Sequence, residues 1–102
     1  MKTESNPAFR AVAILKAHSG REGELRAFVA EVLPEIRRVA GLRKLEASRS
    51  LSDRAQWMLY YWWDSPAHSE RYVAGALYAS IAPQLAVLVK EHLLVVGELF
   101  SE

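Results

Sequence analysis

Hydrophobic and polar positions recur along the chain with periods that predict a short series of strands and helices. The most apolar stretch is Trp57–Trp63, which is aromatic on both alternating faces. This pattern predicts a central strand that is covered on both sides. Because side chains alternate along a strand, odd and even positions should face opposite ways. The two sets are Trp57, Leu59, Tyr61 and Trp63, and then Met58, Tyr60 and Trp62.

Three further segments have strand character. Phe9–Ala17 is short, mostly apolar and β-branched in its middle. Leu42–Ser50 carries more charge, which favours a position nearer an edge, and residues 51–54 form a turn that joins it to Gln56–Trp63 as a hairpin. His92–Phe100 is apolar on both faces and predicts the last strand.

A long helix is predicted between the first two strands. Ser19 and Glu22 have capping-box spacing at its start. Gly41 marks the stop, and Pro34 should bend the helix near its third turn. Apolar residues recur at steps of three and four: Leu25, Phe28, Val29, Val32, Leu33, Ile36 and Val39.

A second helical region follows the aromatic strand. Ser65-Pro66 is a helix opener, and the helix should run to Ala74 and end at Gly75. Residues 77–88 continue with helical spacing, although Pro83 should split or restart this stretch.

The predicted order is strand, helix, strand, strand, helix, strand. This is the ferredoxin-like β-α-β-β-α-β arrangement of the α+β class, a four-stranded antiparallel sheet with helices on one face. The other face would be bare and apolar, so two copies should pack sheet to sheet as a homodimer.

Composition narrows the possible functions. The 102 residues carry 51% apolar side chains and a net charge of +1 without a block of either sign. Nucleic acid is therefore not an expected partner, because phosphate binding needs a clustered basic face. There is no cysteine, no paired metal-ligand spacing and no apolar run of ~20 residues, so we expect no metal, no membrane span and a cytoplasmic location. Residues 1–7 are polar and predict a flexible N-terminus before one domain over 8–102.

Three short motifs resemble the antibiotic biosynthesis monooxygenase (ABM) family of dimeric α+β barrels. Residues 15–25 are similar to that family's strand-to-helix junction, and Gly41-Leu42 to the turn before its second strand. Residues 59–65 resemble its motif of an aliphatic strand ending in Trp-acidic-Ser, which makes Trp63 the motif tryptophan. The resemblance implies a homodimer with a pocket between sheet and helices, and an oxidation of phenols by dioxygen without a cofactor.

Two departures from the family pattern bear on the chemistry. Many members carry a histidine nine residues after the motif tryptophan, where this chain has Tyr72. In the haem-degrading relatives the asparagine, tryptophan and histidine would fall on Ala13, Tyr72 and Ala82, so haem chemistry is not expected.

The candidate site residues each have a structural alternative. Trp63, Tyr61 and Trp57 could wall a pocket for a flat aromatic molecule or belong to the core. His68 could take a phenol proton or face solvent in the first turn of its helix. Tyr72 could hydrogen-bond a substrate oxygen or pack on the sheet, and Arg49 could neutralise a phenolate or be solvated.

The sequence therefore favours a small cofactor-independent monooxygenase for a hydroxylated aromatic or quinone-like compound. Catalysis would fall to His68 and Tyr72, and binding to Trp63, Tyr61, Trp57 and Arg49. Two alternatives use the same dimeric fold: a non-enzymatic module that binds or senses a small molecule, and a small-molecule isomerase.

Overall fold

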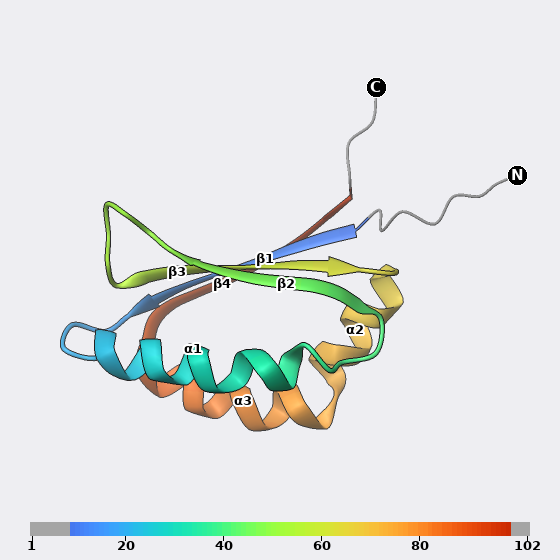
Figure 1. Cartoon of the computed structure of the whole chain (residues 1–102). Helices are drawn as coiled ribbons and strands as arrows, with labels where there is room; N and C mark the ends of the chain where they lie inside the picture. The colour runs from blue at the N-terminus through green and yellow to red at the C-terminus, as the bar shows by residue number, and fades with distance from the viewer. Residues whose placement is uncertain (1–8, 99–102) are drawn as a thin grey trace, which may run out of the picture.

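The computed structural model describes residues 9–98 and contains one antiparallel sheet with helices on one face (Figure 1). This confirms the predicted ferredoxin-like α+β fold. The predicted flexible segment 1–7 and the last two residues of the predicted fourth strand lie outside the described residues. In chain order the elements are β1 Phe9–Ala17, α1 Glu22–Ile36, β2 Leu42–Arg49, β3 Gln56–Trp63, α2 Pro66–Ala74, α3 Ala76–Leu88 and β4 Val89–Glu98.

The sheet has the strand order β2-β3-β1-β4, so β1 and β3 are central. In the register of the sheet, Ala11 of β1 lies between Tyr61 of β3 and Val96 of β4. The pairing of β1 with β4 shifts between Lys16 and Ala17. Helices α1 and α3 run side by side beneath the sheet, while α2 lies at one end (Figure 1).

The two faces of β3 are those predicted from its alternation. Leu59, Tyr61 and Trp63 point toward the helices and are buried, with Trp63 only 1% exposed. Tyr60 and Trp62 lie on the opposite face and are half-buried. The aromatic stretch therefore supplies both the core under the helices and much of the outer face of the sheet.

Helix α1 departs from its prediction at both ends. Its N-cap is Arg21, without a side-chain cap bond, so the capping box at Ser19 is wrong. Gly20 has a φ of 86°, a conformation that glycine adopts readily, and forms a turn between Ser19 and the helix. Because of this turn, Ser19 does not occupy the cap position. The helix ends at Ile36, before the predicted stop at Gly41.

The later helices confirm the opening at Ser65 and the break at Gly75. The Ser65 hydroxyl accepts a hydrogen bond from the His68 amide at 3.3 Å, and Gly75 separates α2 from α3. Pro83 lies inside α3 and does not split it, contrary to the prediction. Ile81 and Leu85 are buried on either side of the proline, and this packing outweighs the lost backbone bond.

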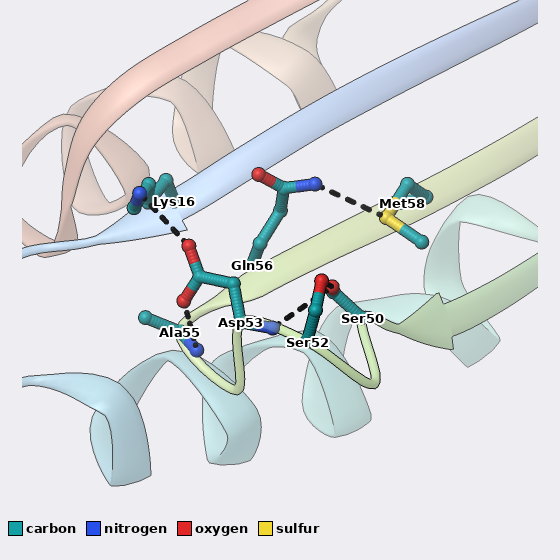
Figure 2. Close-up of polar contacts among 7 residues, drawn as sticks. All are labelled: Lys16, Ser50, Ser52, Asp53, Ala55, Gln56 and Met58. Carbon is teal, nitrogen blue, oxygen red and sulfur yellow. Dashed lines mark hydrogen bonds and ion pairs between the residues drawn. The ribbon is translucent and has the colours of Figure 1, made fainter.

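An ion pair ties the β2–β3 hairpin to the end of β1 (Figure 2). Lys16 Nζ lies 2.8 Å from Asp53 Oδ2. The Asp53 carboxylate also accepts from the Ala55 amide at 3.1 Å, and the Asp53 amide donates to Ser50 Oγ at 3.1 Å. No helix within residues 9–98 combines the length and the apolar character that a membrane crossing requires.

Candidate functional site

Two adjoining hollows lie between the helix face of the sheet and the helices. We call the first the mouth cavity; it is lined by Ala11, Ala13, Tyr61, Trp63, Ser69, Tyr72, Val73, Tyr78, His92 and Leu94. We call the second the apolar chamber; it is lined by Ala13, Leu15, Phe28, Val29, Val32, Ile36, Leu59, Tyr61, Tyr72, Tyr78, Ile81, Leu85 and His92. The two hollows adjoin, because five residues line both of them: Ala13, Tyr61, Tyr72, Tyr78 and His92.

Both hollows are narrow. The centre of a water-sized sphere can move through about 20 Å³ in the mouth cavity and about 30 Å³ in the apolar chamber. A single water needs ~10–15 Å³ by this measure. Each hollow therefore admits one or two molecules of that size, and an aromatic ring enters only if side chains at the mouth move.

Four aromatic rings form one continuous wall of the mouth cavity. Tyr61 and Trp63 are stacked, with ring centroids 6.0 Å apart and planes 6° apart. Tyr72 is tilted against both of them, at 6.1 Å from Tyr61 and 5.7 Å from Trp63. Tyr78 meets Tyr72 edge-on at 5.4 Å. The stacked pair comes from β3, and the other two rings come from α2 and α3.

The phenols in this wall are held in their neutral form. Burial raises the pKa of Tyr61 to about 12, although a hydrogen bond from Tyr72 lowers it somewhat. Burial also raises the pKa of Tyr72, and its interaction with Tyr61 raises it further. Since both groups stay protonated at neutral pH, they can donate or accept hydrogen bonds there but cannot act as bases.

His92 is a site residue that sequence reasoning missed. It pairs with Leu15 in the β1–β4 register, so its ring lies on the helix face and lines both hollows. Partial burial lowers the pKa of His92 below its ordinary 6.5, which leaves the imidazole neutral at pH 7. His92 is the one histidine among the described residues that line these two hollows. The prediction began the strand at His92, whereas β4 begins at Val89; only the register with β1 reveals its face.

His68 lies outside both hollows. Its Nδ1 is 2.8 Å from the Ser65 hydroxyl, and its ring lies so close to Gly41 that any side chain there would overlap it. His68 lines a separate, more open groove of about 200 Å³, together with Arg71. Tyr72 lines both this groove and the mouth cavity, whereas His68 lines the groove alone.

Trp57 and Arg49 lie at the other end of β3 from Trp63. Their guanidinium-to-ring distance is 5.6 Å, and Arg49 Nε donates to the Arg54 carbonyl at 2.7 Å. Trp63 lies six positions along the strand from Trp57, which corresponds to about 20 Å. The structure therefore brings together Trp63, Tyr61 and Tyr72, while Trp57, Arg49 and His68 lie elsewhere. Within residues 9–98, no three histidine or acidic side chains gather as a metal site would require.

A model of the antibiotic biosynthesis monooxygenase family matches residues 8–83, and the chain belongs to this family. No curated protein gives a significant sequence match.

Solved structures share the fold at low identity. A candidate antibiotic biosynthesis monooxygenase from Deinococcus radiodurans is 17% identical, with a TM-score of 0.83 over 92% of this chain and 94% of its own. Another from Bordetella bronchiseptica is 16% identical, with a TM-score of 0.80 over 93% and 99%. A protein of unknown function from Nitrosomonas europaea is 18% identical, with a TM-score of 0.83 over 97% and 95%. At these identities the likeness shows the fold and not the reaction.

Proposed function

We propose that the protein is a cofactor-independent monooxygenase that oxidises a hydroxylated aromatic compound. The observation that carries this proposal is the mouth cavity, where four stacked or edge-on rings lie beside a neutral imidazole. Aromatic walls suit a flat apolar substrate. A neutral histidine at the rim suits the removal of a phenol proton near pH 7.

The proposed reaction uses the electrons of the substrate itself. A phenol whose ring system carries a CH₂ group loses a proton, and the anion reduces dioxygen and forms a C–O bond at that carbon. Loss of water from the resulting peroxide turns CH₂ into C=O, so one oxygen atom enters the product and the other leaves as water. The protein contributes a base, hydrogen bonds to the anion and a water-poor cavity.

Each role falls to a residue of the mouth cavity. His92 removes the phenol proton, because it is the imidazole that reaches the cavity. The Tyr72 hydroxyl, which lines the same cavity, donates a hydrogen bond to the substrate anion. Tyr61 and Trp63 stack on the substrate. This assignment keeps three of the residues expected from the sequence and replaces His68 by His92 as the base.

Substrate entry requires the mouth cavity to widen. Val73 of α2 and Tyr78 of α3 line the mouth on either side of Gly75, where the chain is extended between the two helices. Rotation at this joint would draw both side chains away from β4. Gly75 has little room for a side chain, since an added Cβ would lie 3.0 Å from the Arg71 carbonyl oxygen.

The outer face of the sheet is the surface through which we propose that two copies of the chain associate. None of the helices within residues 9–98 covers this face (Figure 1). It carries half-buried and exposed apolar side chains: Val12, Ile14, Met58, Tyr60 and Trp62, and the exposed Leu93 and Val95. An apolar sheet face of this kind is buried when two sheets pack together. A homodimer of this form is part of the proposal.

Oxygen uptake tests the proposed reaction. Purified protein is incubated with anthrones and hydroquinones, and uptake is followed with an oxygen electrode. Trp63→Phe should lower kcat/KM at least tenfold, because the larger ring stacks on the substrate. Trp62→Phe is the matched control, since it makes the same change on the opposite face of β3. Equal rates for the two variants contradict the placement of the substrate.

A binding or sensing module is the second candidate, and one observation favours it. The hollows are too small for a ring unless the mouth opens, which suits a protein whose shape reports the presence of a ligand. Saturable binding of an anthrone without oxygen uptake supports this candidate. Turnover that proceeds equally well under nitrogen points to an isomerase and contradicts both.

A further inference from the structure

The apolar chamber differs from the mouth cavity in the chemistry of its walls. Eight residues line the chamber alone, and their side chains carry no hydrogen-bonding atom. All eight are buried, with exposed fractions of 0.07 or less. They come from both sides of the interior, such as Leu59 from β3, Val32 from α1 and Leu85 from α3.

Water is a poor occupant of the part of the chamber that these eight residues line. The chamber offers about 30 Å³, which exceeds the ~10–15 Å³ that one water needs. A buried water also needs two to four polar partners, and the polar atoms of the lining residues lie on the residues shared with the mouth cavity. The part of the chamber that the eight apolar residues line therefore favours a small guest that makes no hydrogen bonds.

We propose that the apolar chamber is a binding site for dioxygen, which enters through the mouth cavity. The size of the space selects a guest of two heavy atoms, because an aromatic guest such as benzene needs a cavity of about 150 Å³. This inference rests on the proposed function, in which dioxygen is the second substrate. Tyr61 and Tyr72 line both hollows, so dioxygen in the chamber would lie beside an aromatic substrate in the mouth cavity.

Paramagnetic relaxation by dioxygen tests the site without any turnover. Methyl spectra of the labelled protein are compared under pressurised dioxygen and under nitrogen at the same pressure. The methyl groups of Leu59, Val32 and Leu85 should relax several-fold faster under dioxygen than those of Leu25. Leu25 is the matched control, because it is fully buried and lines neither hollow. Equal enhancement at all four residues overturns the inference.

A filled chamber gives a second test. Val32→Ile adds one methyl group inside the chamber, and Val87→Ile makes the same change on the exposed side of α3. The first variant should weaken the relaxation effect and raise KM for dioxygen several-fold, while KM for the phenol stays unchanged. Should Val32→Ile fail to fold, Val29→Ile fills the same chamber from the same helix.

The two proposals fail separately. Enhanced relaxation at the chamber without oxygen uptake on any phenol contradicts the proposed function and supports the dioxygen site. Oxygen uptake with no selective relaxation, or with an unchanged KM for dioxygen in the folded chamber variants, overturns the site and leaves the proposed function standing.

Discussion

The rings of Tyr61 and Tyr72 meet at a tilt of 42°, with their centroids 6.1 Å apart. One ring comes from the central strand β3 and the other from α2, so this contact joins the sheet to the helical layer. Burial of both side chains favours a neutral phenol over a phenolate. The pair therefore supplies hydrogen-bonding groups to the mouth cavity without placing a charge in it.

Removal of the Tyr72 hydroxyl should raise the pKa of Tyr61 further. In Tyr72→Phe, the donor that lowers the pKa of Tyr61 is lost, so Tyr61 should titrate above its present value of about 12. The variant should lose about 1 kcal/mol of unfolding free energy. The measurement is the ¹³Cζ shift of labelled tyrosine against pH, with Tyr60→Phe on the outer face as the control.

The raised pKa values of Tyr61 and Tyr72 predict how the free energy of unfolding changes at alkaline pH. Tyrosines in the unfolded chain ionise near pH 10, before Tyr61 and Tyr72 in the folded protein. The unfolded state therefore binds fewer protons above that pH, and the free energy of unfolding should fall as pH rises. Titration of Tyr61 near pH 10 in the folded protein would contradict the burial that raises its pKa.

The pH dependence of oxygen uptake should identify His92 as the base. Since burial lowers the pKa of His92, kcat/KM should stay high at pH 7 and fall only as pH drops below 6.5. His92→Gln should remove this acid limb and cost 10²–10⁴-fold in rate. His18→Gln, at the exposed turn after β1, is the control. If His68→Gln loses the acid limb of the pH profile while His92→Gln keeps it, His68 rather than His92 is the base.

Much of the fold could be predicted because local patterns and tertiary packing agree. The alternation of β3 placed Tyr61 and Trp63 on the helix face, and Gly75 marked a helix break. The errors arose where a local pattern had a competitor. Gly20 turns the chain before Ser19 can cap α1, and burial of α3 residues keeps that helix continuous through Pro83.

The alternation of side chains along β3 predicts only part of the candidate site. Tyr61 and Trp63 share one face of a strand, so alternation groups them. Tyr72 lies in the helix predicted directly after this strand, and in the structure its ring contacts Trp63. Trp57 shares this face, but the rise along a strand places it about 20 Å from Trp63, so alternation was a poor reason to group the two in one site. The face of His92 depends on its pairing with Leu15, and that of His68 on its contact with Gly41; neither follows from spacing along the chain.

The Lys16–Asp53 ion pair predicts a stability difference that depends on pH. Asp53→Asn removes the charge but keeps an oxygen acceptor for the Ala55 amide, so it isolates the ion pair (Figure 2). The hydrogen bond from Lys16 lowers the pKa of Asp53, so the contribution is present above the carboxyl's ordinary pKa and is lost as pH falls through the lowered value. Unfolding titrations of both proteins should therefore differ at pH 6 and converge in strong acid.

Two controls test whether the effect of Asp53→Asn comes from the ion pair. Added salt should reduce the difference between wild type and Asp53→Asn at pH 6, because the pair is partly exposed and is screened. In the Lys16→Gln background, Asp53→Asn should have little further effect. A difference that persists in strong acid, or in the Lys16→Gln background, would assign the effect of Asp53→Asn to the hairpin turn instead of to the ion pair.

A charge on the outer face of the sheet should prevent the proposed homodimer. Ile14 lies at the centre of that face, between Met58 of β3 and Leu93 of β4 in the sheet register. Ile14→Glu would place a carboxylate inside a sheet-to-sheet interface, where an unpaired charge is strongly disfavoured. Sedimentation velocity at micromolar concentration should show a dimer for wild type and a monomer for this variant. Val87→Glu, on the exposed side of α3, makes a matched change outside the interface and should remain dimeric. A wild-type monomer at that concentration contradicts the interface, because the apolar face would then be stable in water without a partner.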